Sequence, residues 1–228
     1  FLLRRFYLIK AILFDFDGTL LNRDLSLMSF INDQYERFSN CIHHIPKQLY
    51  IDRFIELDNR GYTWKDQVYM QLVDEFNIQN VSADDLLNDY LKNFHLHCIA
   101  FPNLFKMLHQ LKSQKYKLGI ITNGKGQFQM DNIVALGLNK VMDTILISEW
   151  ENIKKPNPEI FHRALQKLEV NAFESVYVGD HLENDIKAAK NVGMIAIWKK
   201  NTQWNNVEAE YVVDDLLDLP NIINKFIM

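Results

Sequence analysis

The chain has few of the residues that mark fibrous, disulfide-linked or low-complexity proteins. Its 228 residues include only 2 cysteines, 5 prolines and 8 glycines. Two cysteines cannot form a disulfide framework, so the fold must depend on its hydrophobic core, for which this length is sufficient. So little proline and glycine excludes a collagen-like or linker-dominated chain. Hydrophobic residues make up 48% and charged residues 24%, which is typical of a globular protein.

The sequence also lacks an excess of positive charge and a long hydrophobic run. It has 25 Lys and Arg against 29 Asp and Glu, without a basic stripe, so we expect no nucleic-acid partner. No apolar run approaches the ~18 residues that a membrane-spanning helix needs. The first segment, FLLRRFYLIK, is interrupted by Arg4, Arg5 and Lys10, unlike a signal peptide. We therefore expect a cytoplasmic protein with no membrane partner, and its oligomeric state stays open.

Short, continuous apolar runs recur along the chain and predict strands that are buried on both faces. Helical patterns lie between them. Strands that alternate with helices predict an α/β fold with a doubly wound, mostly parallel sheet. The predicted strands are Ile9–Phe14, Lys117–Thr122, Thr144–Ser148, Ser175–Gly179, Met194–Trp198 and Tyr211–Val213. The helices predicted between and after them are Asn103–Leu111, Gln127–Leu136, Pro158–Leu168, Asn184–Val192 and Leu216–Phe226.

Residues 22–99 interrupt this alternation because they contain no strand-like run. Thr63 with Asp66, and Ser82 with Asp85, have the spacing of capping boxes that begin helices. We predict a four-helix domain, residues 22–99, inserted into a discontinuous α/β core of residues 1–21 and 100–228. Its predicted helices are Leu25–Phe38, Pro46–Asp58, Thr63–Phe76 and Ser82–His97.

Polar residues follow four of the predicted strands, at the edge where open α/β sheets bind ligands. Taken singly, each has an ordinary explanation, since an Asp after a strand is usually a turn former and Thr-Asn-Gly is a common loop. We interpret the joint arrangement as a binding site because all of these residues come at strand ends. They are Asp15 and Asp17; Thr122, Asn123 and Gly124; Lys154 and Lys155; and Asp180 with Asp185.

The residue types indicate phosphate chemistry beside a metal ion. Clustered carboxylates repel one another unless a cation is present, and a hard ion such as Mg²⁺ prefers oxygen ligands. In a straight strand, Asp15 and Asp17 would lie about 6.6 Å apart on one side, which leaves room for a phosphoryl group between a nucleophile and a proton donor. The Thr122 hydroxyl and free N–H groups at Asn123 and Gly124 can hold phosphate oxygens. A lysine can neutralise the remaining charge.

With these residues, the sequence clearly resembles the haloacid dehalogenase superfamily, whose members are mostly Mg²⁺-dependent phosphatases. DFDGTL, IITNG, KKPNPEIF and VGDHLENDIKAA are similar to its four motifs, and IAIWKKN and AEYVVDDLLDL to its last strands. The helical insertion resembles the cap domain that the family carries between its first two motifs. The resemblance therefore covers nearly the whole chain, and it implies a Rossmann-like core with a cap that closes over the site.

The resemblance implies a role for each carboxylate. Asp15 would attack phosphorus and form an aspartyl phosphate. Asp17 would protonate the leaving group and then deprotonate the water that hydrolyses this intermediate. Asp15, the backbone carbonyl of Asp17 and Asp180 would hold Mg²⁺, with Asp185 supporting the metal directly or through water. A proton donor is needed to expel an alkoxide but not a halide, so Asp17 favours phosphate chemistry over dehalogenation.

The resemblance also implies a phosphate-binding set. Thr122, Asn123 and Gly124 would bind phosphate oxygens. Lys155 would contact both the phosphate and the nucleophile, and its position directly before a proline distinguishes it from Lys154. The expected substrate is a small phosphorylated metabolite, which the sequence does not name.

Three other activities stay open, and so does a catalytically weak binding protein that uses the fold as a scaffold, although the intact motif residues argue against it. A phosphomutase would share these motifs but needs cap groups for a second phosphate. A phosphonate hydrolase would need a Schiff-base lysine from the cap, and Lys65 and Lys47 are the candidates. A signalling protein that is phosphorylated on Asp without hydrolysis would share the acidic pocket, but it would have no use for a large helical insertion or for Asp17.

Substrate choice is expected to depend on charged residues of the insertion. Gly61 separates two predicted helices in LDNRGYTWK, and Asp58, Arg60 and Lys65 surround it. Arg23 comes just after the first motif. We expect these four charged residues to contact the substrate; the alternative is an ordinary solvated helix junction.

Overall fold

The computed structural model describes residues 8–201, 204 and 209–226. The segment that carries Arg4 and Arg5 lies outside the described residues. The chain forms two compact units: the core unit, Phe1–Asn22 with Ile99–Met228, and the inserted unit, Arg23–Cys98. Within the described ranges, no helix has both the length and the apolar character needed to cross a bilayer.

The core unit contains a six-stranded sheet in which every strand pairs in parallel with its neighbours. The strand order is β3-β2-β1-β4-β5-β6, which places β1 between β2 and β4. The predicted α/β fold and its strands are therefore confirmed, with ends that differ by at most two residues. The strands are β1 (Ala11–Phe14), β2 (Lys117–Thr122), β3 (Thr144–Ile147), β4 (Ser175–Gly179), β5 (Ile195–Lys199) and β6 (Tyr211–Val213).

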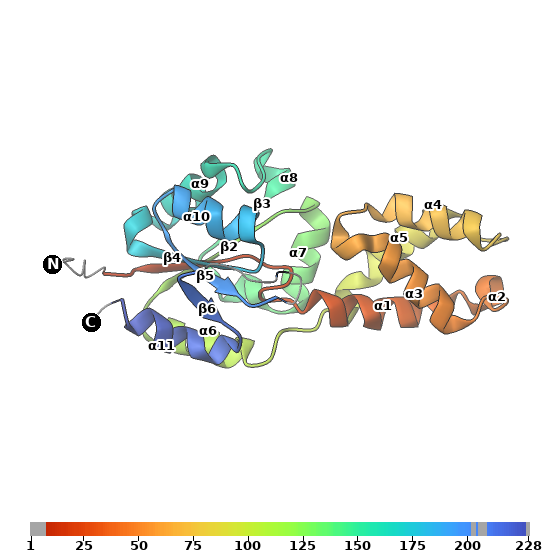
Figure 1. Cartoon of the computed structure of the whole chain (residues 1–228), viewed down its shortest axis with the longest axis horizontal. Coiled ribbons are helices and arrows are strands. Elements are labelled where there is room, and N and C mark those ends of the chain that lie inside the picture. Colours follow the sequence, from red (N-terminus) through yellow and green to blue (C-terminus); the bar gives the residue numbers. More distant parts are fainter. Residues whose placement is uncertain (1–7, 202–203, 205–208, 227–228) are drawn as a thin grey trace. The chain divides into compact units, whose positions relative to one another are not determined.

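Helices cover both faces of this sheet, as the continuous apolar runs of its strands require. Figure 1 shows α9 and α10 over one face, and α6 and α11 over the other. The predicted helix at residues 184–192 is a turn of π-helix, η5 (Leu182–Lys187), followed by α10. The helices are α6 (Leu104–Ser113), α7 (Gly126–Ala135), α8 (Ser148–Glu151), α9 (Pro158–Leu168), α10 (Ala188–Asn191) and α11 (Leu219–Asn224).

One hydrophobic cluster of the core unit lies between the sheet and the helices α9 and α10. Alternate residues of the central strands, such as Leu13 of β1 and Tyr177 of β4, pack there against Phe161 and Ile186. These two strand residues are paired in register. Because β1 is buried along its whole length, its carboxyl end is held firmly beside the ends of β2 and β4.

The inserted unit is helical throughout its regular structure and contains the four predicted helices. Ser82 begins α5 with the predicted capping box, in which its side chain and that of Asp85 bond each other's backbone N–H. The capping box predicted at Thr63 is wrong, because α4 begins at Lys65 with Trp64 at its N-cap and no side-chain capping bond. The α-helices are α1 (Arg23–Arg37), α2 (Ser39–Ile42), α3 (Lys47–Asp58), α4 (Lys65–Glu75) and α5 (Ala83–Asn93), of which α2 was not predicted.

The two capping sites give a matched pair of stability variants. Ser82→Ala removes the oxygen that accepts the backbone N–H of Asp85 at 3.1 Å, so it should lower the free energy of unfolding by about 1 kcal/mol. Thr63→Ala should change it by less than ~0.5 kcal/mol. Urea unfolding followed by circular dichroism measures both, and equal losses in the two variants would contradict the capping assignment.

Candidate active site

The site is built around the ammonium group of Lys155, which lies between carboxylates from two neighbouring strand ends. Its Nζ donates to Oδ1 of Asp15 and to Oδ1 of Asp185, each at 2.7 Å, and to the Tyr177 hydroxyl at 2.9 Å. Asp15 directly follows β1, and Asp185 lies in η5 after β4. The parallel order of these strands therefore brings together residues that are 170 positions apart in the chain.

A third carboxylate completes the acidic cluster. Oxygen atoms of Asp15, Asp180 and Asp185 all lie within 4.8 Å of one another. Asp180 is also held by Asn201, whose Nδ2 donates to its Oδ2 at 2.6 Å, and the Trp198 indole donates to its backbone carbonyl at 2.9 Å. These two partners on and after β5 were not predicted, since an Asn and a Trp near a strand end carry no motif of their own.

Burial and mutual repulsion shift the pKa values of this cluster. Burial raises the pKa of Asp15 well above its ordinary value, against the effect of Lys155, and Asp185 and Asp180 add to the rise. Burial, helped by Asp185, raises the pKa of Asp180 to about 7. Burial by itself lowers the pKa of Lys155, but the charges of Asp15 and Asp185 outweigh the effect of burial and raise this pKa well above its ordinary value. The cluster therefore carries more negative charge than one lysine compensates.

This donor set fits a divalent cation. Three carboxylates offer hard oxygen ligands within reach of one ion, and a second positive charge beside Lys155 would offset their repulsion. Among the described residues, this is the group of acidic, His and Cys side chains whose spacing suits a metal.

The chain bends directly after Asp15, so Asp15 and Asp17 do not lie in the extended backbone for which their separation was calculated. The bend is at Phe16, whose carbonyl accepts the N–H groups of Leu20 and Leu21 at 3.0 and 2.9 Å. Gly18 lies in this turn with a φ of 84°. A Cβ at Gly18 would overlap the Asp180 carboxylate, so glycine lets the turn and the acidic cluster approach each other.

The polar groups in and before the loop after β2 bond to protein partners that the sequence did not predict. The Asn123 side chain locks the Lys155 backbone, because its Oδ1 accepts from the Lys155 N–H at 2.9 Å and its Nδ2 donates to the Lys155 carbonyl at 3.0 Å. The N–H of Gly124 was expected to be free, but it donates to Ser148 Oγ at 2.9 Å. Thr122 is buried at the end of β2, and its Oγ1 accepts from Gln129 at 2.8 Å.

Two residues that contact the site, Tyr177 and Gln129, were missed. Tyr177 lies inside an apolar strand, so it reads as core; its hydroxyl donates to the Ile121 carbonyl at 3.2 Å while accepting from Lys155. Gln129 lies on α7, seven residues after Thr122, and its Nε2 lies 2.6 Å from Asp17 Oδ2. A polar residue facing inward on a helix was the available signal for Gln129.

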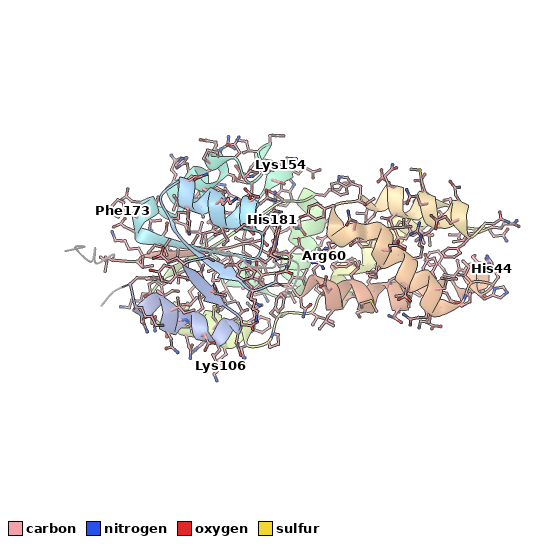
Figure 2. The ribbon with its side chains drawn as sticks, in the orientation of Figure 1. His44, Arg60, Lys106, Lys154, Phe173 and His181 are labelled. Atoms are coloured by element: carbon pink, nitrogen blue, oxygen red, sulfur yellow. The ribbon has the colours of Figure 1, made fainter. Side chains whose placement is uncertain are left out.

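Lys154 is exposed (Figure 2), whereas Lys155 is buried, so the structure places Lys155 and not its neighbour in the cluster. His181, also labelled in Figure 2, caps η5: its Nδ1 accepts the N–H groups of Glu183 and Asn184, both at 3.2 Å. Burial lowers the pKa of His181, which favours the neutral ring that this capping requires.

Three of the four charged residues singled out in the insertion form one ion cluster. Arg23 donates from one guanidinium nitrogen to both oxygens of Asp58 at 2.9 Å, and Lys65 forms a close ion pair with the same carboxylate. Asp58 and Lys65 are buried. The fourth, Arg60, is exposed on a loop in which Asn59, Arg60 and Gly61 all have positive φ (Figure 2).

Comparison with known proteins agrees with this geometry. A model of the family described as haloacid dehalogenase-like hydrolase matches residues 12–199. The glyceraldehyde 3-phosphate phosphatase of Pyrococcus furiosus is 31% identical over 231 residues, which covers 95% of this chain and 94% of that one. The pyrophosphatase PpaX of Bacillus mycoides is 27% identical, covering 95% and 98%. The crystal structure of a HAD phosphatase from Thermococcus onnurineus is 28% identical with a TM-score of 0.66, covering 94% and 98%.

The raised pKa of Asp180 predicts how pH affects the metal-free protein. Its pKa rises from 3.8 to about 7, so between these values the folded state binds more protons than the unfolded state. The free energy of unfolding should therefore fall as pH rises through this window. A divalent cation at this cluster would compete with the proton, so added Mg²⁺ should raise the melting temperature more at about pH 7.5 than at about pH 5.5.

Melting curves with EDTA and with Mg²⁺ at both pH values test this expectation. Asp180→Asn is the control, because it removes the titrating carboxyl group from the acidic cluster and should abolish most of the Mg²⁺ effect. An equal Mg²⁺ effect at the two pH values would contradict the assignment.

Proposed function

Because the chain belongs to the haloacid dehalogenase-like hydrolase family, we propose that it is a Mg²⁺-dependent phosphatase that hydrolyses a small phosphate monoester through an aspartyl phosphate. The observation that carries the proposal is the Asp15–Lys155–Asp185 ion cluster at the carboxyl ends of β1 and β4. It presents a carboxylate nucleophile beside a cation and a metal-binding acidic group.

In the first step, an oxygen of Asp15 attacks phosphorus and the bond from phosphorus to the leaving oxygen breaks. Asp17 gives its proton to that oxygen, so the product leaves as an alcohol. Lys155 would compensate the charge of the phosphoryl oxygens, and the Thr122 hydroxyl would donate a hydrogen bond to one of them. Asn123 contributes by fixing the backbone of Lys155. The Gly124 N–H would contact the phosphate only after leaving Ser148 Oγ.

In the second step, water attacks the phosphorus of the aspartyl phosphate. Asp17, now ionised, takes a proton from this water, and the bond between phosphorus and Asp15 breaks. Inorganic phosphate leaves, and Asp15 and Asp17 return to their starting states. Asp15, the backbone carbonyl of Asp17 and Asp180 would hold Mg²⁺, with Asp185 supporting it, and the ion would compensate charge on the phosphoryl group.

The inserted unit, Arg23–Cys98, would serve as the cap that selects the substrate. Arg23, Asp58, Arg60 and Lys65 are the proposed specificity residues. The Arg23–Asp58–Lys65 cluster holds two cations against one carboxylate, and this excess of positive charge favours a substrate with a second polar or anionic group. The two Schiff-base candidates are both held in ion pairs, Lys65 with Asp58 and Lys47 with Glu36, so neither side chain is placed as a free amine nucleophile, which argues against phosphonate hydrolysis.

Glyceraldehyde 3-phosphate is the first substrate to test, because a relative that aligns over nearly the whole chain is a glyceraldehyde 3-phosphate phosphatase. Inorganic pyrophosphate is the second, since it carries a second anionic group of the kind that the positively charged cluster favours, and another relative is a pyrophosphatase. Both compounds are small and carry phosphate, in keeping with the small phosphorylated metabolite expected as the substrate of a cytoplasmic enzyme.

Phosphate release from these two compounds and from p-nitrophenyl phosphate tests the proposal. Turnover should require Mg²⁺ and fall at least ~10³-fold in Asp15→Asn, which loses the nucleophile. Turnover that persists in EDTA, or in Asp15→Asn, would contradict it.

The cap proposal has its own test. Lys65→Met keeps the length of the side chain but removes one cation, so KM for the preferred substrate should rise about 10-fold with little change in kcat. Lys47→Met is the matched control, because Lys47 pairs with Glu36 on the surface of the same unit. Equal kinetics in the two variants would remove Lys65 from the specificity set.

A further inference from the structure

Gln129 is a buried polar residue that the two steps above do not use. It projects from α7 and is 3% exposed. Its Nε2 lies 2.6 Å from Asp17 Oδ2, 2.8 Å from Thr122 Oγ1 and 3.3 Å from the Asn123 carbonyl oxygen. One amide group therefore connects the proposed acid/base to the end of β2.

We propose that Gln129 is a positioning residue that holds the Asp17 carboxyl group where it can deliver its proton to the leaving group. This inference rests on the proposed phosphatase function. Asp17 follows the bend at Phe16 and is only partly buried, so its side chain is not fixed by packing alone. A proton donor misplaced by about 1 Å loses much of its effect.

The contacts of Gln129 suit this role better than a purely structural one. Its Oε1 is buried without a hydrogen-bond partner among the described residues. A buried acceptor without a partner costs stability, so an apolar side chain of the same size would serve the core better. The amide is therefore explained by the hydrogen bonds that its Nε2 donates, because every acceptor of these bonds belongs to a residue of the proposed site.

Gly124 leaves space for the Gln129 side chain because it has no Cβ. A Cβ at Gly124 would lie 2.7 Å from Gln129 Cγ, closer than packed atoms tolerate, so any other residue at this position would displace Gln129. The loop that follows β2 thus leaves room for Gln129 in addition to its proposed contact with phosphate.

The test compares two substrates that differ in their need for a proton donor. An alkoxide leaves only with protonation, whereas p-nitrophenolate leaves readily without it. In Gln129→Met, which keeps the size of the side chain and removes its donors, kcat/KM for an alkyl phosphate such as glyceraldehyde 3-phosphate should fall at least ~10-fold. For p-nitrophenyl phosphate it should fall less than ~3-fold. Asp17→Asn should show the same pattern with a larger difference.

Asn132→Leu is the matched control. Asn132 is also buried on α7, and neither atom of its amide has a hydrogen-bond partner among the described residues. Its replacement should leave the ratio of the two kcat/KM values unchanged. Gly124→Ala supplies a second variant, which displaces Gln129 without removing its amide and should shift the ratio in the same direction as Gln129→Met.

The outcomes separate this inference from the proposed function. Equal losses on both substrates in Gln129→Met would indicate a structural role and overturn the inference, as would unchanged kinetics on both. A wild-type protein that releases no phosphate from any ester would overturn the phosphatase proposal itself, and the inference with it.

Discussion

Lys155 compensates the repulsion of carboxylates that the fold forces together. Two ion pairs, to Asp15 and to Asp185, hold its ammonium group, and both carboxylates are almost inaccessible to water. Removing one partner from such a buried pair typically lowers the free energy of unfolding by about 3–5 kcal/mol, because the other charge is left buried without a partner. The position of Lys155 is therefore fixed on every side: Tyr177 accepts a third bond from its Nζ, and the Asn123 side chain bonds its backbone.

The parallel sheet explains why these groups meet. With β1 between β2 and β4, the residues that follow the three strands emerge at one edge, where parallel α/β folds bind ligands. Apolar packing on both faces holds the strand ends still, while the turn at Gly18 lets the chain pass close to Asp180. The polar site residues are thus supported by a rigid, apolar sheet. The inserted helices follow β1 in the chain and do not interrupt this sheet.

The strands and the acidic motifs were predictable because each depends on local pattern. A buried parallel strand reads as a continuous apolar run, and Asp15 and Asp180 stand next to such runs, while Lys155 stands out by its position before Pro156. The bend at Phe16 was not predictable, since its bonds to Leu20 and Leu21 close only in the folded turn. Gln129 and Tyr177 were missed for a different reason: their roles arise from tertiary contacts. Tyr177 looks like an ordinary core residue of an apolar strand, and the polar Gln129 on the inward face of its helix was only a weak signal. At Thr63 the capping spacing was present, but α4 begins two residues later.

The nucleophilic role of Asp15 is the central claim, and trapping the intermediate tests it most directly. An acyl phosphate on an aspartate is reduced by borohydride to homoserine, whereas a free carboxylate is not. Protein quenched during turnover of p-nitrophenyl phosphate, reduced and digested, should yield homoserine at position 15, as located by mass spectrometry, and none without substrate. Steady phosphate release with an unmodified Asp15, or with homoserine at another aspartate, would contradict the account.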